Sequence, residues 1–263
     1  MYHSKISGLG YYVPENVVTN DDLSKIMDTN DEWIQERTGI KERRHIIRGE
    51  DTTTSMGVKA AEIAIQRANV AKEDIDFVIF ATLSPDYYFP GPGVLVQRDL
   101  GLRTVGALDV RNQCSGFVYA ISIADQYIKT GMYKNILVIG SEVHSTGLDM
   151  TDRGRGVSVI FGDGAGAAVL SREEDLSKGI LSTHLHSEGQ HAEELSLVAP
   201  GMGKRWVTDI IADNDPNDES YYPYMNGQFV FKNAVVRFSE VINEGLQANN
   251  LQVSDINMLV PHQ

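Results

Sequence analysis

Cys114 has the most distinctive chemistry in this sequence, because it is the only cysteine among 263 residues. The stretch at residues 107–110 predicts a buried strand before it, followed by a short turn. The apolar residues that follow predict a helix ending at Gly131: Phe117, Ile121, Ala124 and Ile128. A thiol at a helix N-terminus meets the positive end of the helix dipole and unpaired backbone N–H groups, which favour the thiolate. The pattern indicates a nucleophile. The alternative is a small buried residue with no chemical role.

His262 is the second residue with catalytic potential. It follows an apolar run at residues 256–260 that predicts a buried strand, and functional groups of α/β proteins gather at the carboxyl ends of strands. A histidine near a cysteine would complete a nucleophile and acid–base pair. A purely structural histidine is the alternative.

Three further patterns have a weaker chemical signal. The glycine-rich stretch at residues 161–167 lacks the Lys-Ser/Thr of a phosphate-binding P-loop, so we interpret it as a tight turn between two strands, at 157–161 and 165–170. His184 and His186 would share one face of a strand and could bind a metal, although a structural role is favoured. Arg153 and Arg155 lie among glycines in a loop, which suits either phosphate binding or a solvated surface.

Alternating strand and helix patterns must position these residues. The sequence predicts strands at residues 6–13, 75–81 and 135–140, and helices at 29–39, 52–69 and up to Gly101. Thr29 and Glu32 have the spacing of a capping box for the first of these helices. The alternation predicts an α/β fold with a mainly parallel sheet.

The pattern restarts after residue 178, which indicates a second half. A strand is expected at residues 179–186, an irregular insertion at 187–224, and a helix from about 231 to 249. We therefore expect two domains, residues 1–172 and residues 173–263. The second half lacks a helix to cover its last strand, so we expect the chain to be a fragment.

Composition narrows the classes of function. A net charge of −13 argues against nucleic acid as a partner, and a single cysteine excludes an internal disulfide or a cysteine-based zinc site. No segment predicts a signal peptide or a membrane span, so we expect a cytoplasmic protein. Basic residues that could meet an acidic partner form two clusters: Arg37, Lys41, Arg43, Arg44 and Arg48, and separately Lys204 and Arg205.

Taken in order, these motifs resemble the β-ketoacyl-acyl carrier protein synthase III family of the thiolase fold. The resemblance spans essentially the whole chain and rests on residues 29–34 with 37–40, 114–117, 124–127, 151–154, 161–168, 184–187 and 260–263. It implies a thiolase-like fold of two similar α/β halves in αβαβα layers, with the second half incomplete here.

The resemblance also assigns roles by position. It implies that Cys114 is the acylated nucleophile and that His262 serves decarboxylation. The positions implied to bind coenzyme A and to line the substrate tunnel are Thr29, Trp33, Arg37, Arg153, Gly154, Ile160, Phe161, Met225 and Gly227. Among these, Trp33 and Arg153 would hold the adenine, and Arg37 would lie near the phosphates. Leu83 and Phe89 would bound the acyl pocket, Phe89 across a dimer interface, and Lys232 would dock acyl carrier protein.

Two loops depart from the family pattern. The loop between Arg153 and Phe161 is longer, and the segment at residues 199–224, with Trp206, is longer and more aromatic. The family's second decarboxylation residue, an asparagine, and a glycine-rich part of its oxyanion hole would lie beyond residue 263. We therefore expect the chain as given not to complete the reaction.

The resulting hypothesis is a decarboxylating Claisen condensation of an acyl-coenzyme A primer with malonyl-acyl carrier protein, which initiates fatty-acid synthesis. It needs no cofactor and no metal, and it implies a homodimer without nucleic-acid or membrane partners. One alternative is a thiolase-fold acyltransferase of secondary metabolism that forms an ester or amide. Another is a non-catalytic partner subunit, which the presence of Cys114 disfavours.

Overall fold

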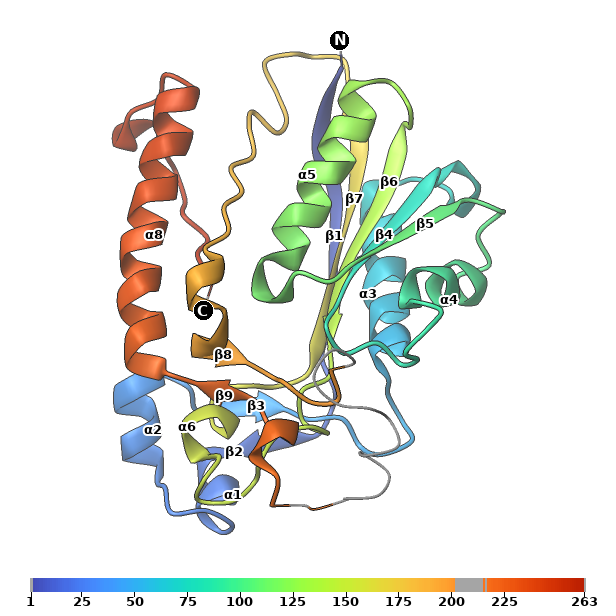
Figure 1. Cartoon of the computed structure of the whole chain (residues 1–263). Helices are drawn as coiled ribbons and strands as arrows, with labels where there is room; N and C mark the ends of the chain where they lie inside the picture. Colours follow the sequence, from blue (N-terminus) through green and yellow to red (C-terminus); the bar gives the residue numbers. More distant parts are fainter. Residues whose placement is uncertain (1, 202–214, 216, 263) are drawn as a thin grey trace.

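A five-stranded sheet is the centre of the fold (Figure 1). The computed structural model describes residues 2–201, 215 and 217–262. The strands are β1 (His3–Tyr12), β4 (Phe77–Ala81), β5 (Gly106–Val110), β6 (Asn135–Glu142) and β7 (Gly164–Glu173), in the order β1-β7-β6-β4-β5. β4 pairs in parallel with both β5 and β6, whereas β7 is antiparallel to β1 and β6. Four strands therefore share one direction, as the alternating pattern predicts.

Helices cover both faces of this sheet. α3 (Thr53–Ala68) and α4 (Pro92–Asp99) pack on one face, and α5 (Gly116–Lys129) packs on the other (Figure 1). Phe80 and Leu137 face α3, while Ile79 and Val138 face α5, and all four side chains are fully buried. Because both faces are covered, the central strands β4 and β6 are almost continuously apolar, as in the sequence.

Local capping sets the helix ends. Thr52 caps α3 through the backbone N–H of Ser55, and Asn69 ends it in the left-handed conformation. In α2 (Asp31–Thr38) the N-cap is Asn30, whose side chain accepts from the Trp33 N–H, and Gly39 ends the helix at φ 72°. The expected Thr29 capping box is therefore wrong by one residue, because the asparagine side chain takes the capping position.

Smaller elements lie beyond one end of the sheet. β2 (Val17–Thr19) pairs with β3 (Glu42–Arg44), next to α1 (Asn20–Ser24), α2 and α6 (Arg155–Ser158) (Figure 1). β8 (Leu195–Ser196) pairs with β9 (Tyr224–Met225), and the long helix α8 (Gly227–Ala248) follows. Short 3-10 turns complete the elements: η1 (Lys72–Asp74), η2 (Gln113–Ser115), η3 (Gly189–Glu194), η4 (Glu219–Tyr221) and η5 (Val253–Asp255).

Three expected strands are absent from the described residues. Residues 157–161 contain the end of α6 rather than a strand, and the stretch at 161–167 is therefore not a turn between two strands. Residues 179–186 pass along α5, where the hydroxyls of Thr183 and Ser122 lie 2.8 Å apart. They make one backbone hydrogen bond to β1, from the Ile180 N–H to the Ser4 carbonyl at 2.8 Å. Residues 256–260 are exposed, with Val260 at 83%. None of the three segments pairs as a strand in the described parts of the chain, so apolar residues alone did not identify strands here.

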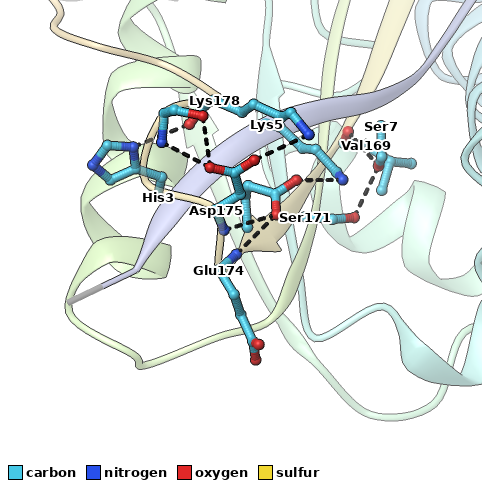
Figure 2. Close-up of polar contacts among 10 residues, drawn as sticks. His3, Lys5, Ser7, Val169, Ser171, Glu174, Asp175 and Lys178 are labelled. Carbon is cyan, nitrogen blue, oxygen red and sulfur yellow. Dashed lines mark hydrogen bonds and ion pairs between the residues drawn. The ribbon is translucent and has the colours of Figure 1, made fainter.

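Polar side chains fasten β1 to β7 and to the turn that follows β7 (Figure 2). The Ser7 hydroxyl donates to the Val169 carbonyl at 3.0 Å and lies 2.8 Å from the Ser171 hydroxyl. His3 Nδ1 hydrogen-bonds with the Lys178 carbonyl at 3.0 Å, and Lys178 pairs with Asp175 at 3.0 Å. These contacts fix the direction in which the chain leaves the sheet. Among the described residues, no helix has the length and apolarity that crossing a membrane requires.

Candidate active site

Cys114 lies between β5 and α5, in the 3-10 turn η2. The turn is held by Asn112 and Ser115: the Asn112 side-chain amide donates to Ser115 Oγ at 3.0 Å, and that hydroxyl donates to the Asn112 carbonyl at 3.1 Å. Gln113 has φ 46°, so the chain turns sharply just before the cysteine. The thiol is free and exposed. α5 begins two residues later, at Gly116, so Cys114 precedes the helix rather than opening it.

Strand pairing places Cys114 and Leu83 on loops that leave the same edge of the sheet. Ala81 and Val110 are paired in the parallel register of β4 and β5, and the Thr82 N–H donates to the Val110 carbonyl at 3.1 Å. The Leu83 N–H donates to the Glu142 carboxylate at 2.9 Å, which connects this loop to the end of β6. This is the carboxyl edge of the parallel strands, where α/β proteins place their sites. β5 itself is a half-buried edge strand rather than the buried strand expected.

A buried carboxylate, Asp163, organises the loops on the other side of this edge. It accepts hydrogen bonds from the backbone N–H groups of Ile46 and His144, both at 2.7 Å, and from Ser145 N and Oγ at 2.9 and 2.5 Å. Four donors to one buried carboxylate satisfy its charge. Through Asp163, the glycine-rich stretch thus holds two other segments in place, at residue 46 and at residues 144–145. Sequence reasoning missed this role, because a carboxylate among glycines is equally typical of a turn.

Two arginines lie close to the ring of Trp33 on α2. The guanidinium carbon of Arg37 lies 4.5 Å from the centre of the Trp33 ring, and that of Arg155 lies 5.5 Å from it. Arg155 opens α6, and its Nη1 also contacts the carbonyl and the carboxylate of Asp28. The structure thus brings two of the predicted coenzyme A positions, Trp33 and Arg37, into one place.

Arg153, the predicted partner of Trp33, has other contacts. Its Nε donates to the Asp149 carboxylate at 2.5 Å, its Nη1 donates to the Asn217 carbonyl at 3.2 Å, and its guanidinium lies 5.0 Å from the Tyr222 ring centre. Burial alone would raise the pKa of the Asp149 carboxyl, but hydrogen bonds from Thr151 and Arg153 outweigh it and hold that pKa below the usual value. Gly154 follows, and a side chain there would collide with the Asp149 backbone.

An apolar cluster lies beneath these arginines. Ile160 and Trp33 pack against the buried side chains of Leu23, Ile34 and Val159. Thr29 precedes α2, and its hydroxyl is buried without a hydrogen-bond partner. Thr29, Trp33, Gly154 and Ile160 are therefore gathered where α1, α2 and α6 meet.

The buried Arg43 joins these elements. Its Nη2 donates to Asn20 Oδ1 and to the Val159 carbonyl, both at 2.8 Å. The Asn20 side chain in turn donates to Asp31, at the start of α2, at 2.8 Å. One side chain thus links β3, α1, α2 and the segment that leads to Phe161. Residue type alone did not indicate this role, since Arg43 is one of several basic residues in a row.

The remaining predicted positions are distributed over three regions. Phe161 packs on His144, with ring centres 4.8 Å apart, and Met225 lies in β9 just before Gly227 begins α8. Phe89 is 82% exposed on the loop before α4. Lys232 is exposed on α8, and His262 is exposed after η5, so the pairing of His262 with Cys114 stays a prediction. Lys204, Arg205 and Trp206 lie outside the described residues.

His184 and His186 both contact one carboxylate on α8. His184 Nδ1 lies 3.1 Å from Glu244 Oε1, and His186 Nε2 lies 2.6 Å from Glu244 Oε2. Hydrogen bonds from His186 and His184 lower the pKa of Glu244. Within residues 2–201, 215 and 217–262, no three His, Cys, Asp or Glu side chains have an arrangement that could hold a metal. The two histidines instead attach α8 to the segment at 179–191.

Known proteins match this fold and this order of residues. A family model for 3-oxoacyl-[acyl-carrier-protein] synthase III matches residues 108–189. The chain is 44% identical over 261 residues to the beta-ketoacyl-[acyl-carrier-protein] synthase III of Methylococcus capsulatus, covering 99% of this chain and 77% of that protein. Synthase III 1 of Vibrio vulnificus is 46% identical with the same coverage. The crystal structure of 3-oxoacyl-[acyl-carrier-protein] synthase III from Aquifex aeolicus superimposes with a TM-score of 0.87 at 42% identity, covering 98% of this chain and 76% of that one.

The α/β architecture and these structural matches define a thiolase-like fold, which confirms the predicted fold class, and place the chain among the condensing acyltransferases. At this level of identity and coverage, the chain belongs to the β-ketoacyl-[acyl-carrier-protein] synthase III family. It is an enzyme of the transferase class.

Proposed function

We propose that the protein condenses an acyl group from acyl-coenzyme A with malonyl-acyl carrier protein, with Cys114 as the nucleophile. The observation that supports this most strongly is the position of an exposed thiol in a tight turn at the carboxyl edge of the sheet. An exposed thiol can meet the thioester of an acyl-coenzyme A, and a cysteine acts as a nucleophile on such a carbonyl.

The first half-reaction transfers the acyl group. The Cys114 thiolate attacks the thioester carbonyl, the carbon–sulfur bond to coenzyme A breaks, and coenzyme A leaves as a thiol after taking up a proton. Backbone N–H groups near the cysteine stabilise the oxyanion of the tetrahedral intermediate, an electrostatic contribution worth about 3 kcal/mol per donor.

The second half-reaction forms the carbon–carbon bond. Malonyl-acyl carrier protein loses carbon dioxide, and His262 donates a hydrogen bond to the developing enolate oxygen. The carbanion attacks the acyl carbonyl, and the thiolate of Cys114 leaves as the 3-ketoacyl product forms. The nucleophile is a side chain and the carbanion arises from decarboxylation, so this chemistry draws on no cofactor.

The coenzyme A part of the substrate is proposed to bind at α2 and α6. Trp33 and Arg153 would hold the adenine, and Arg37 would lie near the phosphates. The pantetheine arm would then pass the residues that line the tunnel towards Cys114: Thr29, Gly154, Ile160, Phe161, Met225 and Gly227. The guanidinium groups near Trp33 supply the positive charge that an acidic protein needs for a polyanionic substrate.

The acyl pocket, the partners and the location complete the proposal. Leu83 and Phe89 would bound the acyl group, with Phe89 contributed across a homodimer interface. Lys232 on the exposed face of α8 would dock the acidic acyl carrier protein. Coenzyme A and acyl carrier protein both serve cytoplasmic metabolism, so the cytoplasm is the proposed location.

Intact-protein mass spectrometry after incubation with acetyl-coenzyme A tests the nucleophile. We expect a gain of one acetyl group in the wild type and none in Cys114→Ala, while a Cys114→Ser variant should react at least about 100-fold more slowly, because a hydroxyl is a far weaker nucleophile than a thiolate. An adduct that persists in Cys114→Ala would refute the assignment.

Release of carbon dioxide separates the condensation from its alternative. When malonyl-acyl carrier protein is added to the acetylated enzyme, condensation releases carbon dioxide and yields a 3-ketoacyl product. An enzyme that instead transfers the acyl group to an alcohol or amine would become acylated but would leave malonyl-acyl carrier protein intact.

A further inference from the structure

Two arginines near Trp33 and α6 differ in the burial of the carboxylates with which they pair. Arg153 and Arg155 are two residues apart in one loop, and both had equal claim to phosphate binding from the sequence. In the structure the Arg155 guanidinium lies over the Trp33 ring, 5.5 Å from its centre and on the same aromatic side chain as Arg37, whereas Arg153 lies over Tyr222. The difference between their ion pairs decides which guanidinium can reach a ligand.

Arg153 is bound to a buried partner. Asp149, which accepts its Nε–H at 2.5 Å, is only 7% exposed at its side chain. If Arg153 turned towards a phosphate, it would leave a buried carboxylate without its counter-charge, a change that typically destabilises a protein by about 3–5 kcal/mol. A phosphate at Arg153 would also meet the negative charge of Asp149 close by. Arg153 is thus committed to the loop.

Arg155 is bound to an exposed partner. Its Nη1 donates to the exposed Asp28 backbone carbonyl and lies 3.1 Å from the Asp28 carboxylate, whose side chain is 86% exposed. An exposed ion pair of this kind contributes about 0–1 kcal/mol, because water solvates both charges once they separate. Arg155 can therefore exchange Asp28 for a phosphate with little loss of stability, and a planar guanidinium can bind phosphate oxygens in pairs.

We propose that Arg155, together with Arg37, binds a phosphate of coenzyme A beside Trp33, and that Asp28 is the carboxylate that the phosphate displaces from Arg155. This inference rests on the proposed function for the identity of the ligand. It assigns the phosphate contact to Arg155 in the longer loop, while Arg153 stays paired with Asp149. Asp28 becomes a residue that weakens substrate binding.

Isothermal titration calorimetry with three ligands tests the proposal without requiring turnover. Coenzyme A carries the 3′-phosphate and the diphosphate, dephospho-coenzyme A carries only the diphosphate, and pantetheine carries neither. Arg155→Met should weaken coenzyme A binding about 5- to 10-fold, and Arg155→Lys should restore part of the affinity. Asp28→Asn should tighten coenzyme A binding about 2- to 3-fold, because the competing carboxylate is removed. Pantetheine should bind all variants equally.

The controls separate binding from folding. Arg98 on α4 is also exposed and also pairs with an exposed carboxylate, that of Asp99. The Arg98→Met variant should therefore bind coenzyme A like the wild type. Arg153→Met should lower the unfolding midpoint in urea, whereas Arg155→Met should not, since only Arg153 neutralises a buried carboxylate. The ratio of affinities for coenzyme A and dephospho-coenzyme A identifies which phosphate Arg155 contacts.

Unchanged coenzyme A affinity in Arg155→Met, or weaker affinity in Asp28→Asn, would overturn the inference. Failure of the proposed function gives a different result. If the wild type binds no coenzyme A and gains no acetyl group, the substrate class is wrong. If the wild type binds and is acetylated but Arg155→Met does the same with equal affinity, only the role of Arg155 is wrong.

Discussion

His45, next to the Phe161 backbone, shows how burial alters the pKa of one side chain. It is 8% exposed, and burial lowers its pKa more than the nearby Asp163 charge raises it, while Arg43 lowers it further. A histidine with a pKa depressed in the folded state stabilises the fold above its unfolded pKa of about 6.5. That contribution is lost as the pH falls through this value towards the folded pKa.

We therefore predict that His45→Asn changes the pH dependence of stability. At about pH 7.5 the variant should be less stable than the wild type by about 1 kcal/mol, from lost packing. As the pH falls to about 5.5 the difference should shrink. In the wild type alone, unfolding exposes a neutral ring that then takes up a proton, which favours the unfolded state. Urea unfolding at both pH values measures the two differences. Equal differences at both would show that His45 does not titrate as its burial requires.

The elements of the first half were predictable because local signals and burial agree there. The apolar spacing of α3 coincides with a Thr52 cap, and the continuous apolar runs of β4 and β6 have helices on both faces. The predictions of strands at 179–186 and 256–260 were wrong, because an apolar sequence does not by itself provide a partner strand. The contacts of Arg43, Asp163 and Arg155 depend on residues about 20 to 130 positions away, which spacing does not reveal.

The contact of β1 with α3 gives a prediction at the scale of elements. A methyl group on Gly10 would collide with the Ala60 carbonyl and the Ala64 backbone of α3. Gly10→Ala should push the helix away from the sheet and destabilise the protein by about 2–3 kcal/mol. Gly166 on β7 pairs with Tyr11, and nothing lies within 4 Å of a methyl group there. Gly166→Ala should therefore be neutral or stabilising by about 0.5 kcal/mol.

Thermal and urea unfolding of the two variants measure this contrast. Both substitutions remove one glycine from the β1–β7 pair, so the effect on the unfolded chain is the same and only the collision with α3 differs. A Gly10→Ala variant as stable as Gly166→Ala would mean that α3 does not pack as closely on β1 as the structure shows.

At the scale of the whole molecule, two surfaces are more apolar than a lone chain needs. On α8, Phe231 and Val235 are exposed. On the loop before α4, Tyr87, Tyr88 and Phe89 are exposed together.

The division into halves at residues 172 and 173 stays a proposal, but it agrees with β7 ending at Glu173, after which no strand joins the main sheet in the described residues.

The aromatic loop supports the proposed homodimer because it lies beside an open strand edge. β5 is the last strand of the sheet, so one row of its backbone groups has no strand partner within the described chain. The Gly93 N–H, just after the loop, donates to Asp109 of β5 at 2.8 Å, which places the loop and the open edge on one side of the molecule. Exposed aromatic side chains next to an unpaired edge are typical of a subunit interface.

Replacing Tyr88 and Phe89 by serine should therefore dissociate the proposed homodimer. Loss of two aromatic anchors from each subunit should weaken association at least about 100-fold, because such residues contribute about 2 kcal/mol or more each at the centre of an interface. Sedimentation velocity over a range of protein concentrations measures the mass of the species. Met132→Ser, which removes an exposed apolar side chain after α5, is the control and should sediment like the wild type. A wild type that stays monomeric at all concentrations would refute the homodimer, and a double variant that still dimerises would move the interface away from this loop.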